Sequence, residues 1–147
     1  MTSTPKLLPM GVSFDDRGSV RFLNGLEFSD WKRFYIVSNF QNGFVRSWHA
    51  HQLESKLVFV LSGAIKIGLV PIHDFEAPDP EIKPMQFVLT SQSNQALHIP
   101  AGYANGFKTL QENTQVFFFS SASLEESKSD DFRYPWDFWH IWNEDFR

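Results

Sequence analysis

Short runs of strand-forming residues recur along the chain, and residues typical of turns close each run. Within residues 64–70, for example, Ile65, Ile67 and Leu69 alternate with a lysine and a glycine, which directs one face of a strand toward a core. The expected strands are residues 19–23, 33–38, 44–50, 56–61, 64–70, 85–90, 96–99, 106–110 and 114–121. Strands repeated at intervals of roughly 8–12 residues are typical of a sandwich or barrel, so the sequence predicts an all-β fold.

The segments between the expected strands are tight turns and two longer connections. Ser62-Gly63 suits a hairpin, since glycine adopts positive φ without steric cost. Residues 71–84 carry four prolines and four acidic residues and indicate an ordered loop, whereas the charged residues 123–131 suit a short helix or a solvated loop. Because no repeat or low-complexity linker divides the chain, we expect one domain over residues 1–147.

Composition supports this fold class and limits the function classes. Phenylalanine occurs 16 times and aromatic residues make up 16% of the chain; such residues favour strands. The net charge of −4 argues against a general nucleic-acid-binding surface, and the absence of cysteine excludes disulfides and thiolate chemistry. No apolar run has the length of a signal peptide or of a membrane span, so we expect a cytoplasmic protein that binds neither nucleic acid nor membrane.

An aromatic segment lies near the end of the sequence. Residues 132–142 include six aromatic side chains among eleven residues. One interpretation is a C-terminal flap that covers one end of the barrel or contacts another subunit, because large aromatic side chains mostly serve packing. The other interpretation is a wall of a ligand cleft, and the two are compatible.

The strongest candidates for chemistry lie within residues 43–56. Residues i and i+2 of a strand point to the same face, so His49 and His51 would project side by side. Arg46 and Lys56 nearby would lower the pKa values of the histidines and favour neutral imidazole, the form that acts as a base. Three interpretations follow: two structural histidines on an exposed strand, a metal site that includes Glu54 and a later histidine, and acid–base catalysis.

A second motif, residues 97–107 (LHIPAGYANGF), combines a strand, a Pro-Gly turn and another strand. Together the two motifs resemble those of the cupin superfamily, G-x5-H-x-H-x3–4-E-x6-G and P-x-G-x2-H. Gly43 to His51 fits the first half, but Glu54 comes early, and Asn105 stands where the second motif has a histidine. Asparagine is a poor ligand for transition metals, so we expect neither a metal nor another cofactor.

Within the cupins, the chain resembles sugar-nucleotide enzymes of the dTDP-4-dehydrorhamnose 3,5-epimerase type. Residues 16–18 (DRG), 43–49 (GFVRSWH), 56–58 (KLV) and 99–107 (IPAGYANGF) match their D-x-R-G, G-V-L-R-G-L-H, K-L-V and I-P-x-G-F-A-H-G-F motifs. The related 3,4-ketoisomerases carry K-R-x-Y-Y-I and R-G-x-H-A-H. Residues 32–36 (KRFYI) and 49–51 (HAH) resemble that branch. The likeness runs from residue 15 to about residue 121 and implies a double-stranded β-helix sandwich.

The resemblance also implies roles for individual residues. His49 would be the base, His51 a second acid or base, and Lys56 a cation that holds the oxyanion. Arg46 would contact diphosphate, which suits a planar guanidinium, and Asp137 is the candidate equivalent of an aspartate that supports the base. The further residues expected to bind substrate are Tyr35, Arg33, Trp48, His98, Asn105 and Phe119. His98 would line the cleft or pack against a tryptophan.

The sequence departs from the epimerases near the end of the strand expected at residues 114–121. The epimerases place a tyrosine acid there, whereas this chain has Ser121-Ala122-Ser123. This difference favours the ketoisomerase branch, in which two histidines could move the proton. The expected function is an isomerase or epimerase of a nucleotide-linked 4-keto-6-deoxyhexose in the synthesis of surface polysaccharides, with a homodimer as the working form. The alternatives are a non-catalytic cupin that binds sugars or nucleotide sugars and a small metal-dependent enzyme.

Overall fold

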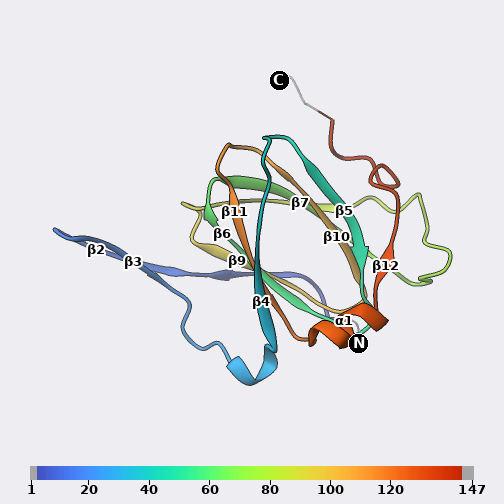
Figure 1. Ribbon diagram of the computed structural model, residues 1–147, viewed down its shortest axis with the longest axis horizontal. Helices are drawn as coiled ribbons and strands as arrows, with labels where there is room; N and C mark the ends of the chain where they lie inside the picture. The colour runs from blue at the N-terminus through green and yellow to red at the C-terminus, as the bar shows by residue number, and fades with distance from the viewer. Residues whose placement is uncertain (1–2, 144–147) are drawn as a thin grey trace.

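The computed structural model describes residues 3–143 of the 147-residue chain. Within these residues the chain forms twelve strands, one short α-helix and one 3-10 turn, η1 (Phe28–Asp30). Ten of the strands make two five-stranded antiparallel sheets that face each other across a core (Figure 1). The all-β jelly-roll fold predicted from the sequence is therefore confirmed. In the same part of the chain, no helix has the length and apolar character needed to cross a membrane.

The two sheets interleave strands that are distant in the sequence. The first sheet has the order β1 (Lys6–Pro9), β9 (Gln95–Ile99), β6 (Lys56–Ser62), β11 (Gln115–Ser120) and β4 (Arg33–Ser38). The second has the order β12 (Phe132–Arg133), β5 (Val45–Ala50), β10 (Tyr103–Thr109), β7 (Ala64–Pro71) and β8 (Met85–Thr90). The chain crosses from one sheet to the other between β6 and β7, so strands that carry the two sequence motifs meet around one interior.

The predicted hairpin between β6 and β7 is present, and its geometry requires glycine. Gly63 has φ of 83°, a left-handed conformation that side chains disfavour. A Cβ atom at this position would also lie 2.1 Å from Oγ1 of Thr114, so a larger residue would force the turn apart. The loop expected at residues 71–84 begins at Pro71, the last residue of β7, and residues 72–84 contain no helix or strand.

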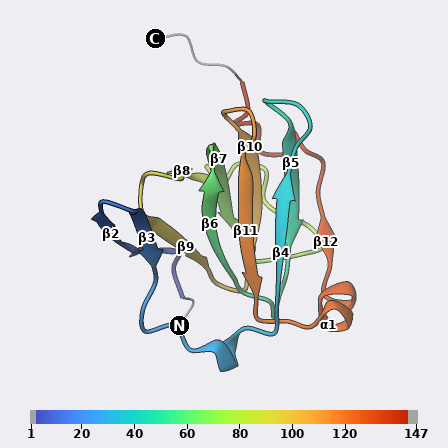
Figure 2. The ribbon, with the colours of Figure 1, turned by 60° about the vertical axis from the view of Figure 1, so that its left-hand side comes forward.

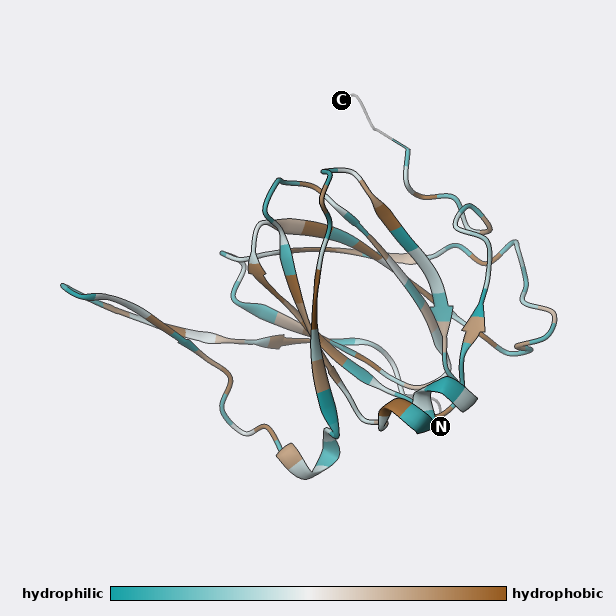
Figure 3. Cartoon of the chain, in the orientation of Figure 1, coloured by the Kyte–Doolittle hydropathy of each residue, from teal (hydrophilic) through white to brown (hydrophobic). Residues whose placement is uncertain are grey.

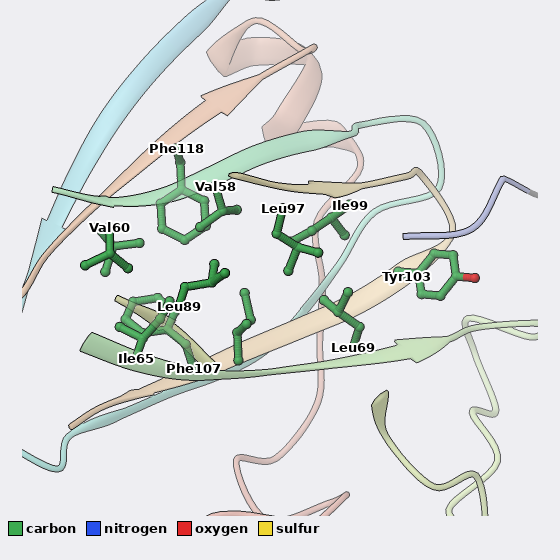
Figure 4. Close-up of a cluster of buried hydrophobic side chains, with 12 residues drawn as sticks. Val58, Val60, Ile65, Leu69, Leu89, Leu97, Ile99, Tyr103, Phe107 and Phe118 are labelled. Atoms are coloured by element: carbon green, nitrogen blue, oxygen red, sulfur yellow. The ribbon is translucent and has the colours of Figure 1, made fainter. Parts of the chain in front are cut away.

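The core lies between the inward faces of the two sheets. Figure 4 shows buried side chains from both sheets meeting there, including Val58, Leu97 and Phe118 from the first sheet and Ile65 and Leu69 from the second. Figure 3 shows hydrophobic stretches along these strands. The period-2 alternation that predicted the strands is what fills this core, since each strand contributes every second residue to it.

Three strands were not expected from the sequence: β1, β12 and β2 (Gly11–Asp15). The last pairs with β3 (Gly18–Phe22) to make a hairpin that projects from the barrel (Figure 1). Its partner β3 matches the strand expected at residues 19–23, and every residue of β3 is exposed. The charged segment at residues 123–131 contains the helix α1 (Leu124–Ser129). Figures 1 and 2 both place α1 at the end of the barrel where β4 begins.

The aromatic segment of residues 132–142 packs along the outside of the second sheet, as Figure 2 shows beside β5. Trp139 and Trp142 contact Trp48 of β5, with ring centroids 5.4 and 5.3 Å apart. Gly68 of β7 leaves room for this packing, because a Cβ there would lie 2.8 Å from the Trp48 ring. The segment therefore covers a sheet face, and its aromatic rings form a second hydrophobic cluster.

Candidate active site

A cavity of about 370 Å³ opens between the two sheets at the end of the barrel where α1 lies. Side chains from β4, β5, β6, β10, β11 and α1 line it. Seven of the site residues predicted from the sequence are among them: Arg33, Tyr35, Arg46, His49, His51, Lys56 and Asn105. The two sequence motifs thus meet in one place, with cationic groups and imidazoles around a common space.

Strand alternation explains which side chains reach this cavity. On β4 the residues Arg33 and Tyr35 point inward, whereas Phe34 between them is exposed on the outer face of the first sheet. On β5, His49 lines the cavity and Trp48 beside it faces the aromatic segment. Arg46 also lines the cavity although it is three residues from His49, and the pairing of β5 with β10 shifts register between these two positions.

His49 is held in its neutral form. Burial lowers its pKa most, and the positive charges of Lys56 and Arg133 lower it further, whereas Asp131 acts in the opposite direction. Together these effects take the pKa from 6.5 to about 4. At neutral pH the imidazole is consequently unprotonated and able to accept a proton.

His51 lies deeper in the wall and uses both ring nitrogens. Nδ1 contacts the backbone carbonyl oxygen of Asp130, which follows α1. Nε2 lies 3.0 Å from Oε2 of Glu54. The His51 side chain is 7% exposed, so these contacts hold it firmly in place.

Glu54 is a fully buried carboxylate at the centre of a polar network. Its Oε1 accepts hydrogen bonds from Nη2 of Arg33 at 3.2 Å and from the hydroxyl of Ser120, and its Oε2 accepts one from Ser127 at 3.0 Å. Burial raises the pKa of Glu54, but the hydrogen bond from His51 and the charge of the nearby lysine outweigh burial. The pKa accordingly falls from 4.5 to about 2, and the carboxylate is ionised.

Lys56 places a buried ammonium group in the cavity. Its Nζ lies 5.9 Å from the ring centroid of Tyr35 and 5.8 Å from that of Phe118. The two rings are stacked 5.0 Å apart, and the guanidinium of Arg33 lies 5.0 Å from the Tyr35 ring on the same wall. A buried cation held against aromatic faces is poised to attract negative charge from a ligand.

Asn105, which stands where the second cupin motif has a histidine, forms a hydrogen bond to the backbone. Nδ2 of Asn105 donates a hydrogen bond to the carbonyl oxygen of His49 at 3.2 Å and so ties β10 to β5. Among residues 3–143, no group of three or more histidine, aspartate or glutamate side chains has an arrangement that could hold a metal ion. Glu54, which a metal site would need, points to hydrogen-bond donors instead.

Four predicted site residues, Trp48, Phe119, His98 and Asp137, do not line this cavity. Trp48 and Phe119 point away from the interior because their strands alternate, and each packs on the outer face of its sheet. His98 packs against a tryptophan, the second of the two arrangements expected for it: on the outer face of the first sheet its ring lies 6.1 Å from that of Trp31. Asp137 is exposed in a turn of the C-terminal segment and lines no part of the cavity.

Sequence reasoning missed the residues around α1 that complete the site. Asp131 and Arg133 line the cavity and form an ion pair with a separation of 3.0 Å, and both charges act on His49. A signal for α1 was present: Ser123 and Glu126 form a capping box, whose S-x-x-E pattern can be read from the sequence. That α1 brings charged groups over the cavity depends on long-range contacts that no local pattern reveals.

Comparison with known proteins gives a consistent result. The sequence matches the family described as dTDP-4-dehydrorhamnose 3,5-epimerase over residues 15–137. A curated relative, the spore coat polysaccharide biosynthesis protein SpsL of Bacillus subtilis (strain 168), is 26% identical over 109 residues, which are 71% of each chain.

Two solved structures illustrate the likeness in fold. One is QdtA, a sugar 3,4-ketoisomerase from Thermoanaerobacterium thermosaccharolyticum in complex with TDP, with a TM-score of 0.73 and 18% identity over 95% of this chain and 94% of that one. The other is ChmJ, a 3'-monoepimerase from Streptomyces bikiniensis in complex with dTDP-quinovose. Its TM-score is 0.80 and its identity 15%, over 99% of this chain and 78% of that one. At these identities the comparison establishes the fold.

Proposed function

Because the chain belongs to the dTDP-4-dehydrorhamnose 3,5-epimerase family, we propose that it is an isomerase or epimerase of a nucleotide-linked 4-keto-6-deoxyhexose. The observation that carries this proposal is a neutral imidazole, His49, in a cavity that also holds the buried cation Lys56. Relatives named for polysaccharide biosynthesis, 3,4-ketoisomerisation and 3'-epimerisation support a role in making deoxysugars for surface polysaccharides.

The chemistry begins with removal of a proton from a carbon next to the ketone. His49 accepts that proton, because its low pKa keeps the ring free of a proton at neutral pH. The electron pair left on carbon shifts into an enolate, and the negative charge develops on the former ketone oxygen. Lys56 is placed to stabilise this oxygen, since its ammonium group is buried in the same wall.

The nucleotide part of the substrate is bound by other residues of the cavity. Arg46 lies toward the rim, where Nε donates to Oδ1 of Asn39 at 2.7 Å and the guanidinium remains exposed. A planar guanidinium matches the oxygens of a diphosphate, so Arg46 is the proposed phosphate contact. Tyr35 and Arg33 extend the wall and suit stacking and hydrogen bonding to the sugar.

The test is incubation of the protein with dTDP-4-keto-6-deoxyglucose in deuterated water, followed by NMR. Exchange at C3 or C5 reports proton abstraction, and a change in the ketone position or in the configuration of a carbon identifies the reaction. The proposal predicts deuterium at C3 or C5 for exchange or epimerisation, and at C4 for a 3,4-ketoisomerisation, whose product has its ketone at C3. Tight binding of the nucleotide sugar without exchange would overturn the enzymatic function and identify a non-catalytic binding protein. Metal analysis of the purified protein adds a check, since activity that depends on stoichiometric Fe, Zn, Ni or Mn would overturn a reaction driven by His49 and Lys56 alone.

We also propose that the protein works as a homodimer. The outer face of the first sheet carries a ladder of stacked rings, with Phe34 and Phe59 at 5.1 and 5.0 Å from Phe117 between them. Phe34 is 61% exposed and Phe28 beside the sheet is 70% exposed. An apolar face of this kind is typical of an interaction surface, and a second copy of the same face is complementary to it.

Sedimentation measures this directly. We expect a dimer at micromolar concentration and a monomer for Phe34→Glu, which places a charge on the ladder without disturbing the inward side of β4. A substitution of Val88 to Glu, on an exposed position of the second sheet, is the matched control and should leave the dimer intact. A monomeric native protein would refute the proposal.

A further inference from the structure

Strand β5 has one residue more than β10 in the stretch where these two strands pair. On β10, Asn105 and Phe107 are two residues apart. Their partners on β5 are His49 and Arg46, which are three residues apart. Two residues of β5 therefore lie opposite one residue of β10, which is the arrangement of a β-bulge. The bulge separates two of the residues to which the proposed function assigns the binding and the chemistry.

The bulge decides which face of the sheet each side chain of β5 reaches. Side chains alternate along a regular strand, so Arg46 and His49 would point to opposite faces if the strand had no bulge. Both of them instead line the cavity. The two residues between them point the other way, because Trp48 packs against the aromatic segment and Oγ of Ser47 donates to the carbonyl oxygen of Trp136 at 3.1 Å. The extra residue thus brings Arg46 and His49 to the same side of the sheet.

Gly106 of β10 leaves the space that the bulge occupies. A Cβ atom at this position would lie 2.3 Å from Cβ of Ser47, 3.1 Å from Cα of the same residue and 3.2 Å from the backbone oxygen of Arg46. Two of these three atoms belong to the backbone of β5, so a side chain here would displace the strand itself. The φ of Gly106 lies outside the left-handed region, so the close approach of β5 is what requires glycine.

Hydrogen bonds hold the bulged part of β5 from both sides. Nδ2 of Asn105 on β10 donates to the backbone oxygen of His49 at 3.2 Å. On the other edge of β5, the backbone N–H of Trp48 donates to the carbonyl oxygen of Tyr134 at 3.2 Å. The N–H of Tyr134 donates in return to the carbonyl oxygen of Trp48 at 3.1 Å. The neighbours of β5 therefore keep the bulge at one place in the strand.

We propose that Gly106 is a positioning residue that admits the bulge in β5 and thereby places Arg46 and His49 in the same cavity. This inference rests on the proposed function, in which Arg46 contacts the diphosphate and His49 accepts a proton from the sugar. One substrate molecule has to reach both groups at once, so both must face one space. Gly106 does not line the cavity and acts only through β5.

Gly106→Ala tests the close approach of the two strands, with one measurement for each of the two residues that the bulge positions. Calorimetry with TDP reports on Arg46, and deuterium incorporation into saturating dTDP-4-keto-6-deoxyglucose reports on His49. We expect Gly106→Ala to bind TDP about tenfold more weakly, because a charge-assisted contact to the diphosphate is misaligned. The rate of incorporation should fall by about 10²-fold, since a displacement of about 1 Å has that effect on a reacting group.

Gly68→Ala is the matched control, because Gly68 pairs with Gly106 on the neighbouring strand β7. The atoms nearest to a Cβ there would belong to the side chains of Ile141 and Trp48, at 2.5 and 2.8 Å, rather than to the backbone of β5. This control should lower the stability of the protein but keep the native TDP affinity and the native rate of incorporation per folded molecule. Equal losses of TDP affinity and rate in Gly68→Ala and Gly106→Ala would overturn the proposal.

A second substitution in β5 should rescue Gly106→Ala. Ser47→Gly removes the Cβ atom that would lie 2.3 Å from the new methyl group, and the two remaining contacts exceed 3 Å. The double variant should therefore recover most of the TDP affinity and of the rate of incorporation, and Ser47→Gly alone should resemble the native protein. A double variant as impaired as Gly106→Ala would show that the contact with β5 is not the cause.

Single cysteines test the direction of the side chains without depending on whether Gly106→Ala folds. The native chain has no cysteine, so each introduced thiol is the only one. Ser47→Cys should react with iodoacetamide at the same rate with and without saturating TDP, because residue 47 points to the aromatic segment. Leu124→Cys, at the cavity, should be protected by TDP. Protection of Ser47→Cys by TDP would place residue 47 on the same face as His49, as in a strand without a bulge, and would overturn the proposal.

The proposed function and the role of Gly106 fail in different ways. If the native protein binds TDP but incorporates no deuterium, the catalytic function is wrong, and the TDP affinities of the variants still decide the role of Gly106. If the native protein incorporates deuterium and Gly106→Ala changes neither the rate nor the TDP affinity, the function stands and the role of Gly106 is wrong. A native protein that neither binds TDP nor incorporates deuterium would overturn both.

Discussion

The environment that keeps His49 neutral should make the folded protein sensitive to acid. In the folded state its pKa is about 4, below the 6.5 of an ordinary histidine, because burial and then the charge of Lys56 disfavour the protonated ring. As the pH falls below 6.5, His49 therefore binds a proton in the unfolded chain but stays unprotonated in the folded protein. His49 thus contributes stability that is present above pH 6.5 and is lost as the pH falls toward 4.

The magnitude follows from the two pKa values. A fall from 6.5 to about 4 corresponds to roughly 3 kcal/mol of unfolding free energy. Because the ring keeps some contact with solvent, screening reduces this figure, and we expect about 2 kcal/mol between pH 7.5 and 4.5. Glu54 loses its own contribution only below pH 4.5, since its pKa is lowered from that value, so it adds little to the change in this range.

The assay is urea unfolding followed by tryptophan fluorescence at several pH values from 7.5 to 4.5. Between pH 7.5 and 4.5, the free energy of unfolding of His49→Asn should fall by about 2 kcal/mol less than that of the native protein. His73→Asn, in the exposed part of the loop at residues 71–84, is the control and should follow the native curve. His98 also has a lowered pKa, from burial and then the charge of Lys6, but it contributes equally to all three proteins. Parallel curves for the native protein and His49→Asn would refute the claim that the fold keeps this ring neutral.

Three further substitutions test individual parts of the structure. Lys56→Met should lower kcat by about 10²–10³-fold while the protein stays folded, and an unchanged kcat would remove this lysine from oxyanion stabilisation. Trp48→Ala should lower the free energy of unfolding in urea by about 3–5 kcal/mol, because the ring is fully buried against the aromatic segment; a loss below about 1 kcal/mol would contradict that packing. Asp130→Ala should destabilise the protein by about 1–3 kcal/mol in the same assay, since three backbone N–H groups lose their acceptor, and an unchanged midpoint would argue against these hydrogen bonds.

The parts of the fold that were predictable from the sequence are those governed by local alternation. The strands that fill the core, such as Ala64–Pro71, show a period of two, and the turn at Gly63 has its own local signal. The same period placed His49 and His51 on one face, and both line the cavity. The projecting hairpin was predicted only in part: the strand expected at residues 19–23 is β3, whereas its partner β2 was not expected.

The parts that were not predictable depend on contacts between distant segments. Glu54 looked like a misplaced metal ligand in the sequence, yet its partners Ser120 and Ser127 lie 66 and 73 residues away. The orientation of Trp48 was also misjudged, because a residue next to a candidate base on a strand points to the opposite side of the sheet. The resemblance to a known family identified residues that line the cavity, such as His49 and Lys56. The contacts that each of these residues makes became clear only from the three-dimensional structure.

The most direct test of the central claim is the rate of deuterium incorporation into dTDP-4-keto-6-deoxyglucose by the native protein and by His49→Asn. In His49→Asn, the rate of deuterium incorporation at the carbon next to the ketone should be about 10²–10⁴-fold lower, because a general base contributes that much to proton transfer. Binding of the nucleotide sugar, measured in parallel by calorimetry, should change little, since Arg46 and Lys56 remain in place. A folded His49→Asn protein that incorporates deuterium at the native rate would show that another group removes the proton.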